Sequence, residues 1–211
     1  LRLYNTIYYK SGWQDAFKSS QTKQDTFTAA DGAAQTVDFM HRTESGSYRK
    51  GDGYTAASRS LNYGRMVFVL PDESVTPESL LQRQGFLAGL TGDYNAAELV
   101  WSVPKFDVKS STELNEVLQS LGVTDAFDMT EADFTPLTDN GAFLSSAMQA
   151  ARVKIDEEGV EAAAYTELVC ADSAMMEVPP TVEMDLNRPF LFVIFDYNNI
   201  PLFVGTVNAL N

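Results

Sequence analysis

Cysteine and histidine are almost absent from this sequence, and their scarcity excludes several kinds of site. The 211 residues include one cysteine, Cys170, and one histidine, His41. A single cysteine cannot form an internal disulfide, so the fold must depend on core packing rather than on cross-links. A single histidine removes the ligand sets of zinc fingers and of most zinc enzymes. We therefore expect no metal site and no cofactor.

Positive charge is scarce as well. Fifteen lysine and arginine residues stand against 29 aspartate and glutamate residues, which gives a formal net charge of -14 and a pI of about 4.3. Such a chain repels phosphate backbones, so we expect no nucleic-acid partner. No apolar run approaches the ~18 residues of a membrane span, and we expect no membrane association. Leu1 is not an initiator methionine, so the lack of a visible signal peptide says little about targeting.

The patterns that are present are those of a mixed globular fold in which strands predominate. Apolar residues make up 45% of the chain and charged residues 21%, which is ordinary for a globular protein. The run MVFVL at residues 66–70 is continuous and apolar, which predicts a strand buried on both faces. Further strands are predicted from β-branched and aromatic content near residues 1–10, 27–28, 36–42, 54–63, 98–109, 148–157, 190–195 and 202–207.

Two helices are predicted from capping signals and periodicity. The first begins near Thr76, which can cap the helix, with Pro77 at its first position. The second covers residues 113–121, with Thr112 as a plausible N-cap and Gly122 as a C-terminal glycine cap. Leu114, Val117, Leu118 and Leu121 recur at the spacing of one helix face and form one apolar stripe.

The segment DEEGVEAAAYTELVCADS at residues 156–173 has two different sides when it is read as a strand, because alternate residues of a strand point to opposite faces. One side is small or apolar throughout: Val160, Ala162, Ala164, Thr166, Leu168 and Cys170. The other side holds both charges and the tyrosine: Glu161, Ala163, Tyr165, Glu167, Val169 and Ala171. The segment is thus suited to lie in a sheet with its small side inward.

The same segment also suits a place outside a sheet. Alanine is a poor strand former, and an Ala-rich stretch that opens with Gly159 leans towards helix or coil. The sequence is compatible with two states, an exposed loop and a strand inside a sheet. Periodicity alone leaves a plain surface loop or a short helix open as the simpler interpretation.

Several motifs of the sequence resemble those of the serpin family. DEEGVEAAAYT resembles the serpin hinge signature, usually written E-E-G-T-E-A-A-A-A-T. Segments along the rest of the chain match the family in its order: NTIYYKSGWQDAF, VDFMHRT, VFVLPDE, VPKFDVKSSTELNEVLQSLGVTDAFD, ADFTPLT, RPFLFVIFD and PLFVGTV. The match runs from Tyr4 to Val207.

The resemblance implies an α+β fold with a large central mixed sheet, two smaller sheets and few helices. It implies that residues 1–211 form the C-terminal part of a single serpin domain, whose N-terminal half would be a partner within the same domain. The reactive-centre loop would be at about residues 159–180. Family members trap a serine protease, which cleaves the loop as bait; the cut loop then inserts into the central sheet and stops deacylation. The protein would not be an enzyme, and family habit makes secretion the expectation.

The resemblance also assigns roles to single residues. Gly159 would be the hinge glycine, Val160 replaces the usual threonine or serine, and Tyr165 replaces a small residue on the outward face. The hinge and insertion stretch as a whole is Glu157, Glu158, Gly159, Val160, Glu161, Ala162, Ala163, Ala164, Tyr165 and Thr166. Glu157 and Lys105 are predicted to pair near Trp13, where the loop would enter the sheet.

The spacing of the family from the hinge glycine puts the bait residue at Ser173 and the residue after the cut bond at Ala174. Met175 and Met176 are the next candidates. Such side chains predict an elastase-like, chymotrypsin-like or subtilisin-like protease as the partner. A trypsin-like target is not expected, because no lysine or arginine occurs between Lys154 and Arg188.

Three other functions remain open from the sequence. A non-inhibitory serpin would act as a carrier, store or chaperone, but such members tend to have charged, bulky or proline residues in the hinge. A cross-class serpin would trap a cysteine protease instead. An enzyme that uses Cys170 and His41 is the weakest alternative, because nothing around Cys170 resembles a catalytic elbow.

Overall fold

The computed structural model describes residues 1–160 and 179–210, which fall into two compact units. The first unit is Leu1–Tyr9 with Val108–Val153, and the second is Lys10–Asp107 with Lys154–Asn211.

The strands are β1 Arg2–Ile7, β2 Ser11–Gly12, β3 Thr22–Thr28, β4 Ala34–Gly51, β5 Tyr54–Leu61, β6 Gly64–Pro71, β7 Asn95–Pro104, β8 Phe106–Glu113, β9 Ser146–Asp156, β10 Gly159–Val160, β11 Thr181–Asp185, β12 Phe190–Phe195 and β13 Pro201–Val207. The helices are η1 Ser19–Gln21, α1 Pro77–Leu81, α2 Phe86–Gly89, α3 Asn115–Ser120 and η2 Asp125–Phe127. Across the described ranges no helix has the length and apolar character of a membrane span.

One five-stranded mixed sheet contains β9, the strand that leads into the hinge motif. In the first unit β1 pairs in parallel with β9, in a register that runs from Arg2↔Ser146 to Ile7↔Ala151. In the second unit the last residues of β9 pair antiparallel with β10, and β10 pairs antiparallel with β2. Strand β8 also pairs with β9. Strand β9 therefore has a parallel partner in β1 and an antiparallel partner in β10.

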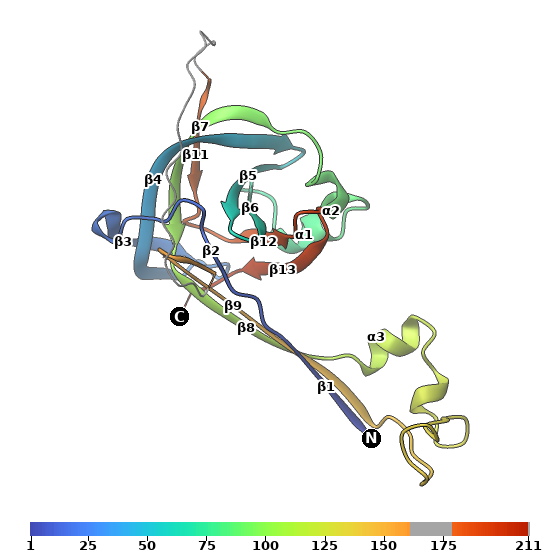
Figure 1. The fold of residues 1–211 in the computed structure, drawn as a ribbon. Coiled ribbons are helices and arrows are strands. Elements are labelled where there is room, and N and C mark those ends of the chain that lie inside the picture. The colour runs from blue at the N-terminus through green and yellow to red at the C-terminus, as the bar shows by residue number, and fades with distance from the viewer. Residues whose placement is uncertain (161–178, 211) are drawn as a thin grey trace. The chain divides into compact units, whose positions relative to one another are not determined.

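An eight-stranded sheet organises the second unit. Its order is β11-β7-β4-β5-β6-β12-β13, and β3 pairs with β4 off this path. Strand β4 has 18 residues and bends within the sheet, so that it pairs with β3, with β7 and with β5 along its length (Figure 1). This long strand joins in one hydrogen-bonded sheet what would otherwise be two smaller ones.

The core of the second unit lies on both faces of β6 and β12. On one face Val67 and Val69 of β6 meet the two short helices, in a buried cluster with Leu191, Val193 and Phe195 of β12 and with Leu80, Phe86 and Leu90 around α1 and α2 (Figure 1). On the other face Phe68 lies among aromatic rings, 5.6 Å from Trp101 and 6.3 Å from Trp13 between ring centroids. Residues 66–70 are all buried, as the apolar run predicted.

Helix α1 begins where the capping signals predicted. The Thr76 hydroxyl accepts a hydrogen bond from the Ser79 amide at 3.2 Å, and Pro77 occupies the first helical position. The Ser79 hydroxyl in turn donates to the Thr76 carbonyl at 2.8 Å. These contacts satisfy amide and carbonyl groups that the first turn of a helix leaves without helical partners.

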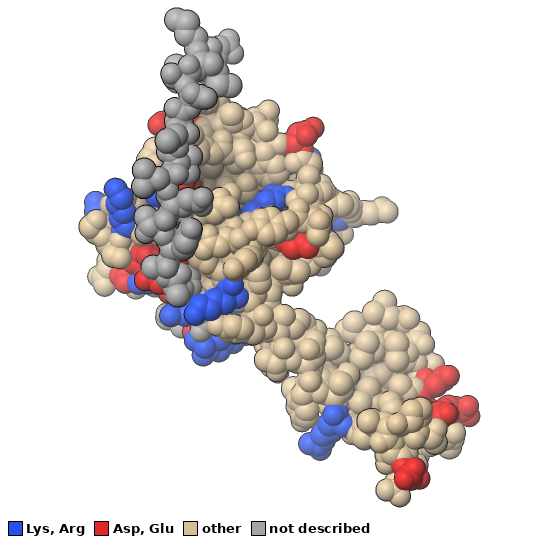
Figure 2. Space-filling model, viewed as in Figure 1, with Lys and Arg blue, Asp and Glu red and all other residues tan. Residues whose placement is uncertain are grey.

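The second predicted helix is present, but it is shorter than predicted. Strand β8 continues to Glu113, so α3 covers only Asn115–Ser120, and Leu114 rather than Thr112 stands at the N-cap. In the apolar stripe Leu114 and Leu118 are half-buried, whereas Val117 is 49% exposed and Leu121 is 75% exposed. Acidic side chains gather on the segment of the first unit that follows this helix (Figure 2). The spacing of apolar residues predicts which face of a helix could be buried, but whether another element covers that face depends on the tertiary structure.

Candidate functional site

The hinge motif begins at a tight turn between β9 and β10. Strand β9 ends at Asp156, whose carboxylate accepts a hydrogen bond from the Glu158 amide at 3.0 Å. The chain then reverses, so that Gly159 pairs with Asp156 and Val160 pairs with Ile155 of β9. Val160 is 1% exposed and Ile155 is 1% exposed. Gly159 and Val160 therefore form a short strand, β10, with the Val160 side chain in the core.

Only glycine fits position 159 without strain. Its φ is +145°, a backbone conformation that residues with a side chain rarely adopt. A Cβ atom here would lie 2.4 Å from the Ser11 carbonyl oxygen and 2.6 Å from the Gly12 Cα. Glycine is thus required at position 159 for two reasons: the positive φ, and the close approach of the β2 backbone to the turn.

Trp13 holds the turn through its main chain and its indole ring. Its amide donates to the Glu158 carbonyl at 2.9 Å, and its Nε1 donates to the Asp156 carbonyl at 3.0 Å. The Phe17 amide donates to the Glu157 carbonyl at 2.9 Å, and the Trp13 and Phe17 rings meet edge to face with centroids 6.0 Å apart. Trp13 is 2% exposed, so its hydrogen bonds are shielded from water. The carbonyls of three successive turn residues are bound by these two residues.

The Glu157 carboxylate lies between a hydroxyl and an ammonium group. Thr22 donates from Oγ1 to Glu157 Oε1 at 2.7 Å, and Lys105 Nζ is 3.2 Å from Oε2. The side chain of Glu157 is 14% exposed. Burial, the largest influence, raises the pKa of this carboxyl, but the hydrogen bonds from Thr22, from the backbone and from Lys105, with the Lys105 charge, outweigh it together. The net result is a pKa below the usual value of a glutamate.

The depressed pKa of Glu157 predicts a pH dependence of stability. A carboxyl whose pKa is lower in the folded state contributes stability above its unfolded pKa, and this contribution is lost as the pH falls through the folded pKa. In the full-length protein, Glu157→Gln should reduce the free energy of unfolding by about 1 kcal/mol at pH 7 and by much less at pH 3. Urea denaturation at the two pH values measures the difference. The same loss at both, or an equal effect of Glu158→Gln at the exposed neighbour, would contradict the assignment.

The structure brings together four of the residues singled out in the sequence: Trp13, Lys105, Glu157 and Gly159. Glu158 is exposed, and only its main chain takes part. The remaining hinge residues and the bait candidates lie outside the described residues: Glu161, Ala162, Ala163, Ala164, Tyr165, Thr166, Ser173, Ala174, Met175 and Met176. Cys170 also lies outside them, so the Cys170–His41 alternative is not tested. Within residues 1–160 and 179–210 no group of three or more possible metal ligands occurs.

Sequence reasoning missed two residues of this region. Thr22 opens β3, and no pattern in the sequence distinguishes it from other threonines. Arg59 could have been found from the sequence, because it alternates along β5 with the buried residues Ala57 and Leu61 and therefore lies on the same face of the strand. A charged residue on the buried side of a strand needs partners, and Arg59 has them in the Glu44 carboxylate and the Trp13 ring.

Comparison with known proteins gives consistent matches over almost the whole chain. The family model described as "Serpin (serine protease inhibitor)" matches residues 1–210. Mouse glia-derived nexin is 32% identical over 221 residues, which cover 99% of this chain and 54% of that protein. Serpin-Z1C of wheat is 31% identical over 224 residues, which cover 98% of this chain and 55% of that protein.

Solved structures agree with the sequence matches. The native state of the thermophilic serpin Tengpin superposes with a TM-score of 0.81 at 30% identity, covering 99% of this chain and 55% of that one. The complex of thyroxine-binding globulin with thyroxine superposes with a TM-score of 0.81 at 27% identity, covering 100% and 56%. The chain thus spans about half the length of the proteins that it matches.

Proposed function

Because the chain belongs to the serpin family, we propose that it carries the bait loop and the receiving strands of a serine protease inhibitor that acts by loop cleavage and insertion. The family consists mainly of protease inhibitors rather than enzymes, and some members are non-inhibitory. The observation that carries the proposal is β10: two residues beyond the turn already pair with β9 on one side and with β2 on the other.

The register of β10 defines how a longer inserted strand would lie. Gly159 pairs with Asp156 and Val160 with Ile155, so the same antiparallel register would set residue 162 opposite Val153 and residue 164 opposite Ala151. Partners in an antiparallel pair share a face of the sheet, and Val153 is 5% exposed. The extension would therefore turn Ala162, Ala164 and Thr166 to the buried face. This side of the segment is the one that the sequence makes small and apolar.

In the proposed mechanism the inserted strand would extend along the part of β9 that pairs with β1. Strand β1 pairs with residues 146–151 of β9, and the chain continues from β1 to β2, which is the partner of β10. Growth of β10 along β9 would separate β1 from β9 and add a strand between them. Each added residue would contribute hydrogen bonds worth about 1 kcal/mol net, and the small side chains would bury apolar area. In the uncleaved protein the far end of the loop is joined to β11, which would hold the loop back from the sheet. Cleavage would free that end, so that insertion could proceed and its favourable free energy could be released.

The proposed chemistry belongs to the protease. Its serine attacks the carbonyl carbon of residue 173, the amine of residue 174 leaves with a proton, and an ester joins protease and inhibitor. Insertion of the loop would then carry the ester and its protease along the sheet before water hydrolyses the bond. This chain supplies no catalytic group in the scheme. We place the inhibitor outside the cell, where its elastase-, chymotrypsin- or subtilisin-like targets act.

A gel experiment tests the proposal. The full-length protein, incubated with pancreatic elastase, chymotrypsin or subtilisin, should form a complex with at least one of them that survives denaturing electrophoresis. Sequencing the released C-terminal fragment should give Ala174 as its first residue. A start at Met176 or at residue 177 would move the scissile bond and leave the mechanism intact.

Heating curves provide the control for stored energy. Material nicked in the loop by a non-target protease should unfold at least about 10 °C above the intact protein, because insertion adds several hydrogen bonds. Complete cleavage without any complex, together with equal unfolding temperatures, would favour a non-inhibitory serpin. Thyroxine-binding globulin, which has a similar fold, was solved in complex with thyroxine, so a small ligand can bind to this fold. A complex with papain but with no serine protease would favour the cross-class alternative.

A further inference from the structure

Arg59 is a charged side chain in the interior of the second unit. It is 4% exposed and lies on β5 between Ser58 and Ser60. Burial, the largest influence, lowers the pKa of its guanidinium, while the nearby Glu44 carboxylate raises it. Its Nη1 has no hydrogen-bond partner among the described residues. A buried guanidinium with an unsatisfied nitrogen costs stability unless its other contacts compensate for it.

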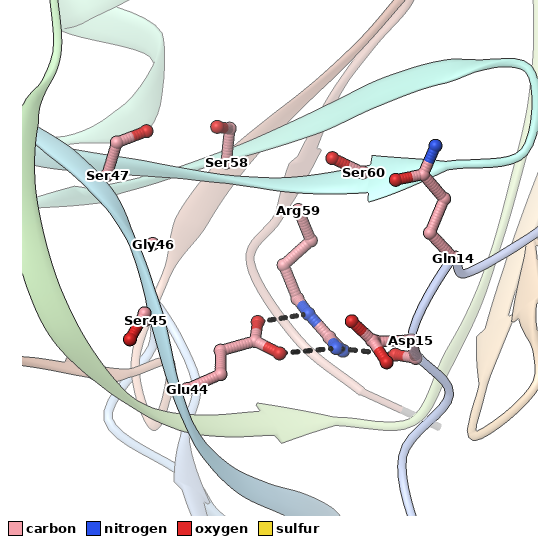
Figure 3. Close-up of a pocket in the computed structure, with 9 residues that line it drawn as sticks. All are labelled: Gln14, Asp15, Glu44, Ser45, Gly46, Ser47, Ser58, Arg59 and Ser60. Carbon is pink, nitrogen blue, oxygen red and sulfur yellow. Dashed lines mark hydrogen bonds and ion pairs between the residues drawn. The ribbon is translucent and has the colours of Figure 1, made fainter. Parts of the chain in front are cut away.

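Those surroundings connect Arg59 to the segment at residues 13–17. The guanidinium binds Glu44 with two nitrogens, Nε to Oε1 at 2.9 Å and Nη2 to Oε2 at 3.2 Å (Figure 3). Its Nη2 also donates to the Asp15 carbonyl at 2.7 Å. The Cζ atom lies 3.9 Å from the centroid of the Phe17 ring and 5.0 Å from that of Trp13. One side chain thus holds a main-chain carbonyl and supports two aromatic rings.

A second arginine strengthens the same support. Arg42 Nη1 donates to the Ala16 carbonyl at 2.8 Å, and its Nη2 is 3.4 Å from the Asp15 carboxylate. Its Nε is 2.5 Å from Glu44 Oε2, so Glu44 joins the two arginines. The carbonyls of residues 15 and 16 are fixed from one side by this network, while the amides of Trp13 and Phe17 bind the β9–β10 turn.

We infer that Arg59 is a positioning residue for loop insertion: it fixes the Trp13–Phe17 segment, which in turn fixes the register in which β10 begins. The inference rests on the proposed function. Insertion competes with hydrolysis of the acyl-enzyme, so a turn that is already in register favours the trap. Without Arg59 the two rings lose the cation beneath them, the Asp15 carbonyl loses its donor, and more of the cleaved inhibitor is released as product.

A pocket beside Arg59 makes the inference testable by chemical rescue. It has a volume of about 200 Å³, and its lining includes Arg59, Glu44 and the four serines Ser45, Ser47, Ser58 and Ser60 (Figure 3). Truncation of Arg59 to alanine would extend this space towards the Phe17 ring. Free guanidinium ion is small enough to enter and to bind the Glu44 carboxylate in the place of the lost side chain.

The test compares Arg59→Ala, Arg59→Lys and Arg65→Ala in the full-length protein. Arg65 is a matched control, since its Cζ lies 4.8 Å from the Phe195 ring and its Nη2 donates to the Leu90 carbonyl, away from the turn. Arg59→Ala should raise the stoichiometry of inhibition about fivefold, because a charge-assisted hydrogen bond and a cation–π contact are lost. The rate constant for initial acylation should change less than about twofold, because the bait itself is not altered. Arg59→Lys should give an intermediate stoichiometry, and millimolar guanidinium should restore part of the loss in Arg59→Ala only.

Hydrogen exchange separates the inference from the proposed function. The amides of Trp13 and Phe17 should exchange at least about tenfold faster in Arg59→Ala than in Arg65→Ala, whether or not the protein inhibits a protease. Normal inhibition by Arg59→Ala, or unchanged exchange of these amides, would overturn the role of Arg59. If the unaltered protein traps no protease while the amides respond as expected, the proposed function fails and the structural coupling stands. If Arg59→Ala does not fold, the stoichiometry of inhibition and the amide exchange of Arg59→Lys test the role of Arg59 instead.

Discussion

Arginine in place of Ala162 should turn the full-length protein from a trap into a substrate, whereas arginine in place of Ala163 should leave inhibition nearly unchanged. The two alanines are neighbours with the same side chain, and they differ only in the face that the register of β10 would give them. The pairs Gly159↔Asp156 and Val160↔Ile155 define an antiparallel register. If the proposed insertion kept this register, residue 162 would lie opposite the buried Val153 and residue 163 opposite the exposed Arg152. Both alanines lie outside the described residues, so the contrast tests the extension itself.

The expected size of the Ala162→Arg effect follows from the cost of burying an unpaired charge. That cost is several kcal/mol, and each 1.4 kcal/mol is roughly a factor of ten, so the stoichiometry of inhibition should rise at least about tenfold. Titration of a fixed amount of the target protease measures it, with gel densitometry of complex against cleaved inhibitor. Equal effects at the two positions would mean that the segment does not enter the sheet in this register.

Alanine in place of Gly159 is expected to disrupt β10 in the intact protein. An alanine at this position would have to adopt a φ of +145°, and its Cβ atom would lie only 2.4 Å from the Ser11 carbonyl oxygen. Strand β2 would have to move to make room for it. We expect a loss of about 3 kcal/mol in the free energy of unfolding, which combines backbone strain with displacement of the strand. Urea denaturation of the full-length protein measures the loss, and exchange of the Trp13 amide reports the release of the turn.

Gly32→Ala is the matched control for the backbone term. Gly32 has a φ of +84°, but nothing lies within 4 Å of the position of its Cβ. This substitution should cost about 1 kcal/mol from the backbone conformation alone and should leave the Trp13 amide protected. If the two variants were equally stable, close contact between β2 and the turn would not be what requires glycine at position 159.

The family and the fold class could be predicted from the sequence because the serpin motifs are local. The hinge motif, the VPKF segment and the two closing strands each occupy a few consecutive residues, and the family match over residues 1–210 confirms the assignment. Helix α1 was likewise predicted from Thr76 and Pro77, since a cap depends on its nearest neighbours along the chain. Helix α3 was not predicted correctly in extent, because β8 competes for its first residues and a distant strand decides that competition.

The sequence by itself determined that the segment after Gly159 has one small side and one charged side, since alternation along a strand needs no knowledge of its neighbours. Only the tertiary structure decided that Val160 is buried and what fixes the turn before it. The register of β10 against β9, the place of Arg59 under Trp13 and Phe17, and the bond from Thr22 to Glu157 join residues far apart in the chain. Such contacts are set by how the sheets pack, and the order of the residues along the chain does not encode them locally.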